Sequence, residues 1–364
     1  MNKAENKLLT TSQFTFTLIA TIISTGILSL PKDVIKNAKQ DGWIGCLLGS
    51  IYPIYMVIIA NYICKKSPKD NMLILSKKCF GNFLGNILFL IFISFFIFQG
   101  TAMLSGFSNV FRVYTTAFLK NHQVLLPVLI ISAYIAYKGI KPLGRLNELT
   151  FYLSFFLFLM PVMTIKYGSI LNLMPVFQSG LIDILKASKE TAWAYTGIEI
   201  IFIVYPFLQD NKKLLKCGIV GISIVVVVYT WLIFLSIFYL GIETIPKYIW
   251  PVLLLADSIT IPIINNFRFI FMTLWSLLAF KSISTCYFAV SYSLNQLIKR
   301  ISAETFVLLL YPILFYISSL YGNPTTRSNY ISKILPIYII FNVIYVSTVA
   351  FLIYLKKGDI SEKK

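Results

Sequence analysis

The sequence is divided into apolar runs of about 20 residues, separated by short stretches that carry most of the charge. A helix needs about 20 apolar residues to cross the hydrocarbon core of a bilayer. Ten runs satisfy this requirement, at roughly 10–30, 43–64, 83–111, 124–140, 146–165, 190–208, 214–241, 262–298, 303–321 and 334–355. The sequence therefore predicts an all-α integral membrane protein with about ten transmembrane helices and the lipid bilayer as its surroundings.

Composition excludes the main alternatives to a membrane protein. Charged residues make up 13% of the chain, about half the roughly 25% of a soluble protein. Aromatic residues make up 16%, which is too much apolar surface for a disordered chain. Five cysteines without a C-x-x-C pair and a single histidine predict no metal site and no cofactor. The net charge of +18 is scattered between apolar runs, so it does not indicate nucleic-acid binding.

Lysine and arginine are distributed unequally between alternate loops. With the N-terminus inside, 19 of these 32 residues fall in inside segments and 11, Arg327 among them, fall in outside segments. Because cytoplasmic loops carry the excess of positive charge, the pattern predicts that both termini are cytoplasmic. The loop charges would then anchor the spans against anionic lipid, with the protein integral to a membrane.

Ten spans divide into two groups of five that run in opposite directions. Such inverted repeats are common in secondary transporters, whose discontinuous helices hold the substrate near the bilayer midplane. We therefore expect one transmembrane domain over residues 1–364 with a LeuT-like 5+5 plan. The first repeat covers about 10–165 and the second about 180–321, and the broken helices are the first (about 10–30) and the sixth (about 190–208).

Both helices that should be broken carry a glycine among hydroxyl residues, upstream of a proline. Unwound backbone at these points would offer free N–H groups to a carboxylate and free carbonyls to an ammonium group. The alternative is that Gly26 and Gly197 only allow close helix packing. The predicted substrate-binding residues at the two breaks are Ser24, Thr25, Gly26 and Ile27 in the first, and Tyr195, Thr196, Gly197, Ile198 and Glu199 in the second.

Two ionisable side chains lie within apolar runs, where such groups are functional candidates. Glu199 is predicted to bind a ligand amine or to take up a proton; the alternative is a structural ion pair with Lys281. Lys281 is predicted to replace a coupling cation near the first break; the alternative is a side chain that snorkels to the interface. We therefore assign coupling or gating to Glu199 and Lys281.

The third span carries polar residues that are candidates for cavity lining or for bridging between helices. Gln99 is assigned to the substrate site, and Thr101, Ser105 and Ser108 follow on the same helix. The sequence contains no Gly-rich phosphate loop, nucleophile elbow or metal cluster, so an enzyme is not expected.

The chain resembles the spore germination permeases, the B subunits of nutrient germinant receptors, within the amino acid–polyamine–organocation transporter superfamily. The order and spacing of several short strings carry the resemblance. These are Ser12-Gln13 before Gly26-Ile27-Leu28-Ser29-Leu30-Pro31, Lys138-Gly139-Ile140 with Gly144-Arg145-Leu146-Asn147-Glu148, Leu171-Asn172-Leu173-Met174-Pro175-Val176-Phe177 before Gly180, Gly197-Ile198-Glu199 with Tyr205-Pro206-Phe207, and Ile261-Pro262 with Phe267-Arg268 and Trp275.

The resemblance implies a receptor subunit that binds a small germinant, usually an amino acid, and triggers spore germination. It also implies a complex with an A-type membrane subunit and a C-type lipoprotein in the inner spore membrane. Two other functions remain open: a proton- or cation-coupled amino acid symporter of the cell membrane, and a ligand-gated ion channel.

Overall fold

The structure is a computed structural model that describes residues 8–259 and 267–355, and the elements in these ranges are helices. The start of the expected eighth run (262–266) and the preceding Ile261 lie outside the described residues. The α-helices of the N-terminal part are α1 (Thr11–Ile22), α2 (Leu30–Ala38), α3 (Gly42–Gly49), α4 (Ile51–Lys66), α5 (Met72–Phe80), α6 (Asn82–Tyr114), α7 (Asn121–Lys138) and α8 (Ile140–Leu159). Those of the C-terminal part are α9 (Leu181–Ala194), α10 (Ile201–Val204), α11 (Leu214–Leu240), α12 (Pro251–Asp257), α13 (Phe267–Leu297), α14 (Ala303–Leu320) and α15 (Pro324–Leu355).

Short 3₁₀ helices connect these elements. They are η2 (Thr25–Leu28), η3 (Lys39–Asp41), η4 (Met160–Tyr167), η5 (Ile170–Leu173), η6 (Ile198–Ile200), η7 (Tyr205–Phe207), η8 (Asn211–Lys213) and η9 (Ile245–Lys247). Within the described ranges, one isolated β-bridge pairs Leu9 with Leu208.

Seven helical segments in the described part are long and apolar enough to cross a membrane, where the sequence predicts ten spans. They are Leu30–Lys66, Asn82–Tyr114, Ile140–Tyr167, Asn211–Leu240, Phe267–Leu297, Ala303–Leu320 and Pro324–Leu355. The expected runs at 10–30 and 190–208 are absent from this set because each is divided into shorter helices. The run at 124–140 forms α7, whose first turn is the polar Asn121-His122-Gln123.

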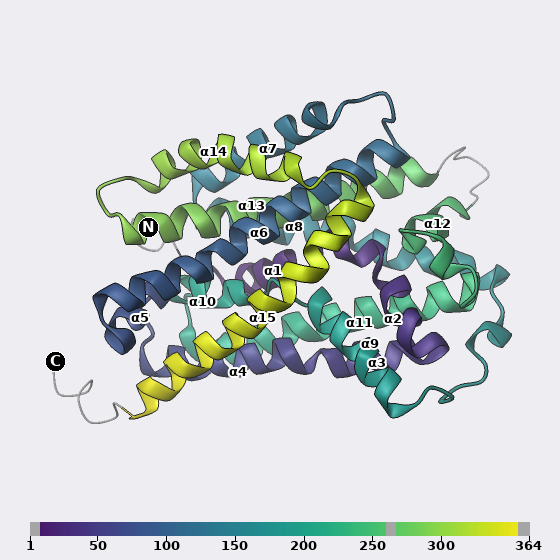
Figure 1. Cartoon of the computed structure of the whole chain (residues 1–364), viewed down its shortest axis with the longest axis horizontal. Helices are drawn as coiled ribbons and strands as arrows, with labels where there is room; N and C mark the ends of the chain where they lie inside the picture. Colours follow the sequence, from purple (N-terminus) through teal and green to yellow (C-terminus); the bar gives the residue numbers. More distant parts are fainter. Residues whose placement is uncertain (1–7, 260–266, 356–364) are drawn as a thin grey trace.

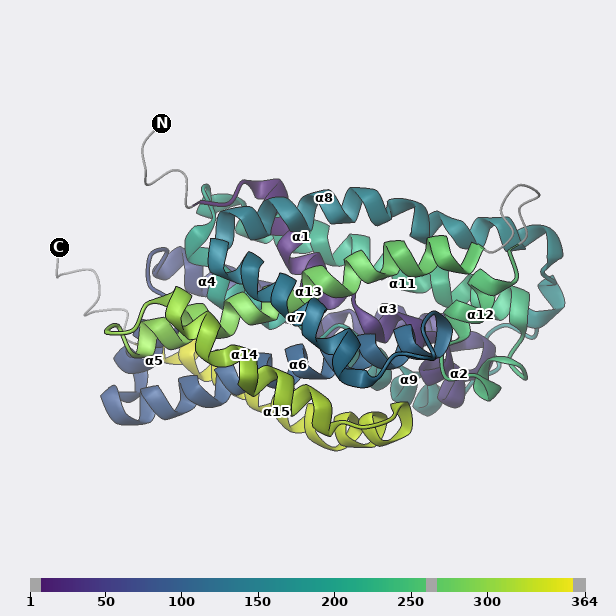
Figure 2. The same cartoon turned by 90° about the horizontal axis from the view of Figure 1, so that it is seen from above.

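The helices surround α1, which packs against α8, α11 and α13. Figure 1 shows α1 in the interior, with α6 and α15 crossing the face in front of it. Helix α1 begins with a capping box. The Thr10 hydroxyl accepts from the Gln13 N–H, and the Gln13 side-chain oxygen accepts from the Thr10 N–H. Figure 2, from above, shows α8 on one side of α1 and α15 on the other. The first helix is thereby kept away from lipid, where its broken backbone would be costly.

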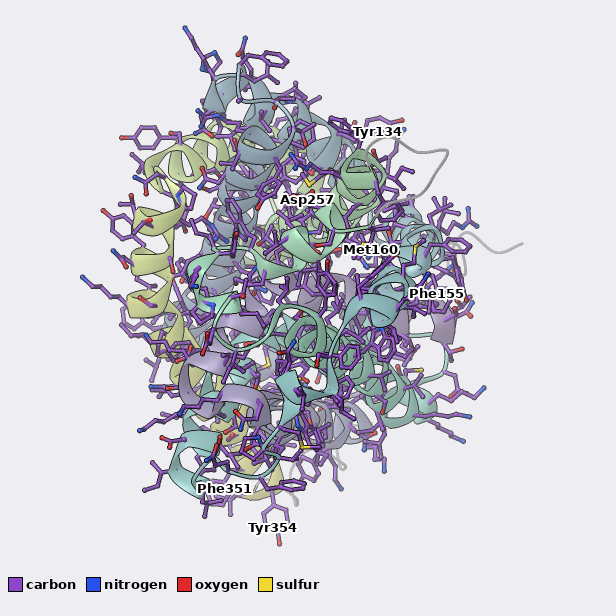
Figure 3. The ribbon with its side chains drawn as sticks, turned by 90° about the vertical axis from the view of Figure 1, so that its right-hand side faces the viewer. Tyr134, Phe155, Met160, Asp257, Phe351 and Tyr354 are labelled. Atoms are coloured by element: carbon purple, nitrogen blue, oxygen red, sulfur yellow. The ribbon has the colours of Figure 1, made fainter. Side chains whose placement is uncertain are left out.

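The outer surface of the bundle is apolar. Phe155, Phe351 and Tyr354 are exposed and lie at the perimeter in Figure 3, which views the molecule from its α12 side. In water such a surface would be a binding or aggregation site, but in a bilayer it is the side that faces lipid.

Loops that the sequence assigns to one side of the membrane meet at one end of the molecule. At one end the contacts join Leu8 with Lys141, Leu9 with Leu208, Asp70 with Tyr205, and Asn71 with Gln296. At the other end they join Ala38 with Ser179, Asp41 with Phe177, Tyr114 with Trp250, and Ser169 with Phe238. This grouping agrees with the predicted alternation of loops; which end faces the cytoplasm stays a prediction.

Candidate functional site

The first helix stops in the middle of the molecule. Helix α1 ends at Ile22, Ile23 is extended (φ −78°, ψ 102°), and Ser24 is non-helical (φ −144°, ψ −137°). The chain then forms η2 and continues as α2, in which Pro31 occupies the first turn and has no N–H to satisfy. The interruption frees the last carbonyls of α1, which must find partners inside the protein.

Side chains from two other helices bond to these carbonyls. The Ser282 hydroxyl on α13 lies within hydrogen-bond distance of the carbonyls of Ala20 and Ile23, and of Leu278 on its own helix, and its single hydrogen is shared among them. The Tyr229 hydroxyl on α11 donates to Ile22 O at 3.1 Å. The carbonyl end of α1 therefore has protein donors around it, so the other groups at the break are the candidates for binding a ligand.

The second interruption lies directly beside the first. Helix α9 ends at Ala194, and Gly197 adopts a left-handed conformation (φ 109°, ψ −19°) before η6. A Cβ at Gly197 would lie 2.4 Å from Thr21 O, so the two breaks touch through backbone. The Gln99 amide on α6 joins them, since its nitrogen lies 3.2 Å from Thr196 O and 3.5 Å from Thr21 O.

A cavity of about 120 Å³ lies where the two breaks meet α6 and α15. Its polar lining includes Ser24, Thr25, Gln99, Thr196 and Arg327. Within the described part of the chain, Ser24 Oγ and Gln99 Oε1 are buried without a hydrogen-bond partner. Buried polar atoms are nearly always satisfied, so these two mark a place for water or a polar ligand.

The predicted binding residues divide into two groups. Five of them line the cavity, namely Ser24, Thr25, Gly26, Gln99 and Thr196. The other five, Ile27, Tyr195, Gly197, Ile198 and Glu199, are not part of its lining and pack behind it. Tyr195, for example, is fully buried and directs its hydroxyl to Cys46 O at 3.2 Å. That any of the ten binds a ligand stays a prediction.

Glu199 stabilises the second break from outside the cavity lining. Its carboxylate accepts from Gly197 N at 2.7 Å, from the Tyr52 hydroxyl, and from the Asn342 amide at 3.5 Å. No ion pair to Glu199 occurs in the described residues. The alternative interpretation of a Glu199–Lys281 ion pair is therefore wrong, because three neutral donors from α4, α15 and the break itself occupy the carboxylate.

We expect Glu199→Gln to lower the thermal midpoint while leaving membrane insertion intact. The amide would turn its NH₂ group toward either the Gly197 N–H or the Tyr52 hydroxyl, and one buried donor would lose its acceptor at a cost of about 1–3 kcal/mol. The measurement is a thermal melt in detergent, with Glu243→Gln, an exposed site, as the control. Equal midpoints for both variants would contradict this stabilising role.

Lys281 is fully buried on α13, beside the carbonyl contacts that Ser282 makes to α1. Its Nζ has no hydrogen-bond partner in residues 8–259 and 267–355 and lies 5.5 Å from the centre of the Phe151 ring. Because Nζ is enclosed by protein, the snorkelling interpretation is wrong. A coupling role for Lys281 stays a prediction.

The polar residues of α6 have different tasks. Gln99 lines the cavity, whereas Thr101 faces Tyr321 (3.3 Å) and Ser108 donates to Asn121 (2.6 Å). Ser105 is buried outside the cavity lining. Bridging between helices is therefore the task of Thr101 and Ser108.

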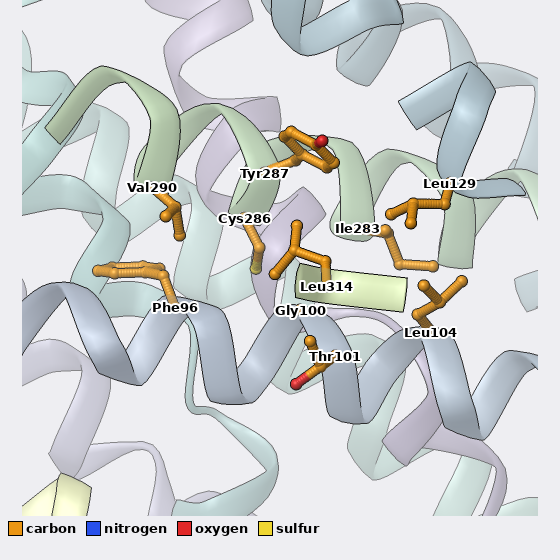
Figure 4. A pocket seen from close by; sticks show the side chains of 10 residues that line it. All are labelled: Phe96, Gly100, Thr101, Leu104, Leu129, Ile283, Cys286, Tyr287, Val290 and Leu314. Atoms are coloured by element: carbon orange, nitrogen blue, oxygen red, sulfur yellow. The ribbon is translucent and has the colours of Figure 1, made fainter. Parts of the chain in front are cut away.

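A second, apolar void lies on the other side of α6. Figure 4 shows it among Leu104, Cys286 and Leu314, with the Thr101 hydroxyl turned away. Its volume of about 10 Å³ is at the lower limit for one water molecule, so it is a packing defect and not a ligand site.

Three residues at the site were not predicted. Arg327 lines the cavity, and Tyr52 and Asn342 hold Glu199. The sequence offered a weak signal for two of them, because Arg327 and Asn342 are polar residues close to or within the tenth apolar run. Tyr52 resembles any interfacial tyrosine, and no pattern marks it.

A partly open cavity between interrupted helices of a membrane bundle is the arrangement that inverted-repeat transporters use for their substrates. The structure of MhsT in complex with L-phenylalanine has this fold: its TM-score is 0.68 at 12% identity, over 94% of this chain and 88% of that one. The structural neighbours are LeuT-fold transporters.

The chain belongs to the family of spore germination proteins, whose family model matches residues 8–327. Spore germination protein YndE of Bacillus subtilis is 27% identical over 80% of this chain and 82% of that protein. Spore germination protein B2 of the same organism is 25% identical over 88% of this chain and 92% of that protein. These relatives are spore germination proteins, and the structural neighbours are membrane transporters.

Proposed function

We propose that this chain is the membrane subunit of a spore nutrient-germinant receptor, which binds a small germinant of the amino acid class and triggers germination. The observation that carries the proposal is the cavity at the two helix breaks, with two unpaired polar atoms in its wall. Binding would shift a conformational equilibrium that partner subunits detect. A ligand shifts such an equilibrium only by its difference in affinity for the two states.

The proposed architecture has ten spans in a 5+5 inverted repeat, with the first and sixth spans discontinuous. It is supported by the α1–η2–α2 and α9–η6–α10 interruptions and by the grouping of loops at two ends. The repeats would cover about 10–165 and 180–321, within a single transmembrane domain. Both termini would be cytoplasmic.

The proposed partners are an A-type membrane subunit and a C-type lipoprotein in the inner spore membrane. The support is membership of the germination family and similarity to relatives such as protein GerQB of Bacillus cereus. The apolar perimeter of the bundle leaves room for helices of a partner subunit.

The cavity predicts a small ligand. An engineered cavity of about 150 Å³ holds benzene, so a volume of about 120 Å³ accommodates a molecule the size of alanine. We expect glycine, L-alanine or L-serine to bind to the protein in nanodiscs, and L-leucine and L-phenylalanine to bind at least tenfold more weakly. Isothermal titration calorimetry measures this, and equal or tighter binding of L-phenylalanine would contradict the assignment of the site.

The alternative function is a proton- or cation-coupled amino acid symporter, with Glu199 or Lys281 as the coupling group. The similarity to transporters and the buried, unpartnered Lys281 favour it. Counterflow of radiolabelled amino acid in proteoliposomes separates the two functions: a receptor binds without flux, whereas a symporter exchanges its ligand across the membrane.

A further inference from the structure

Arg327 places a guanidinium group in the wall of the cavity. It lies in the first turn of α15, where its Nε donates to Ala102 O at 2.8 Å and a terminal nitrogen lies 3.5 Å from Thr25 Oγ1. Gly106 on α6 leaves room for the group, since a Cβ there would lie 2.6 Å from that nitrogen. The guanidinium is thus held between the backbone of α6 and the first break.

Within residues 8–259 and 267–355, the positive charge of Arg327 has no negative partner. The four ion pairs found in the described residues involve other side chains, and no acidic residue lines the cavity. Glu199 is turned toward Tyr52 and Asn342. A guanidinium has five N–H donors, of which two are directed to Ala102 and Thr25. A partly buried arginine without a counter-ion is costly in a membrane protein and is typical of ligand pathways.

We propose that Arg327 anchors the carboxylate of the ligand, and that the ligand is therefore a small carboxylate-bearing molecule. This inference rests on the proposed function. The planar fork of a guanidinium matches a carboxylate in a bidentate pair, which a lysine cannot reproduce. The unpaired Gln99 Oε1 and Ser24 Oγ are acceptors for an ammonium group, so the cavity suits a small zwitterionic amino acid.

This assignment differs from the expectation based on sequence, in which free backbone N–H groups at the first break receive the carboxylate. The backbone at that break is the four-residue η2, which offers only partial charges. Arg327 carries a full charge and several free donors beside the same break. The ligand carboxylate is therefore expected at the α15 side of the cavity.

The test compares L-alanine with L-alaninamide, which lacks the carboxylate, on the full chain in nanodiscs. We expect the wild type to prefer L-alanine, Arg327→Gln to bind it about 100-fold more weakly or worse, and the preference over L-alaninamide to disappear. Arg327→Lys should retain part of the affinity, because it keeps the charge and loses the fork. Gly106→Ala should also weaken L-alanine binding, because its Cβ displaces the guanidinium.

Arg112→Gln is the matched control, since it removes the same charge from α6, where Arg112 bonds to Leu119 O outside the cavity. It should bind L-alanine like the wild type. Wild-type affinity in Arg327→Gln, with the protein folded by thermal melt, would overturn the inference and leave the proposed function standing. Binding of propionate but of no amino acid would retain Arg327 as the anchor and overturn the amino acid assignment. If the wild type binds neither L-alanine nor propionate, both the role of Arg327 and the proposed binding of a small amino acid fail.

Discussion

Gly197→Ala is expected to destabilise the protein severely, by roughly 3 kcal/mol or more. Two effects add at this residue. Gly197 has a φ of 109°, which costs an L-residue about 1–3 kcal/mol. Its Cβ would also lie 2.4 Å from Thr21 O and 2.9 Å from Gln99 Nε2, so the two breaks would have to separate. Forced packing of this kind costs about 1–3 kcal/mol by itself.

The measurement is the thermal midpoint in detergent, together with the yield of monodisperse protein. Gly81→Ala is the matched control, because Gly81 also has a positive φ of 80° but its Cβ would meet nothing within 4 Å. The control measures the cost of a positive φ at a glycine whose Cβ would not clash. A midpoint for Gly197→Ala equal to that of Gly81→Ala would show that the breaks are not in contact.

Gly26→Leu is expected to abolish ligand binding while leaving stability close to that of the wild type. Gly26 lines the cavity, and a Cβ there would meet no atom within 4 Å. A leucine side chain therefore grows into open space, where it takes most of a cavity of about 120 Å³. Burying the apolar surface of the leucine there costs the fold little, but the side chain occupies the space in which the ligand would bind.

Calorimetric titration with L-alanine measures the effect, and a thermal melt verifies the fold. We expect at least a 100-fold loss of affinity in Gly26→Leu and a smaller loss in Gly26→Ala. Gly180→Leu provides the control, since it places the same side chain at an exposed loop position with only Asp183 Oδ2 nearby, at 3.8 Å. Unchanged L-alanine binding in a folded Gly26→Leu protein would remove the ligand from this cavity.

The two glycines have different physical tasks, which their similar surroundings in the sequence do not reveal. Both follow hydroxyl residues and precede a proline, and both lie where a helix is interrupted. Gly197 is required by its left-handed backbone and by the approach of Thr21 O, whereas a Cβ at Gly26 would meet no atom within 4 Å. Pattern analysis predicts a break at each position, but the reason for each glycine depends on what packs against it.

Arg327 was assigned to an exterior loop for a clear physical reason. The residues around it are polar, and the apolar run that marks the tenth span begins only at residue 334. The helix nevertheless starts at Pro324, and its first turn extends over the cavity. Hydropathy measures the length of chain dissolved in lipid, and it does not register a helical turn that covers a polar site inside the protein.

The sequence by itself determined that the protein is an all-helical membrane protein of the spore germination family, and it predicted seven of the apolar helices that the described residues form. These features depend on local hydropathy, charge and backbone preference, which are set by residues close together in the sequence. The tertiary structure alone decided that Glu199 pairs with Tyr52 and Asn342 instead of Lys281, and that Arg327 enters the cavity. Those contacts join residues more than a hundred positions apart, so they depend on which helices lie side by side, and no local pattern encodes that.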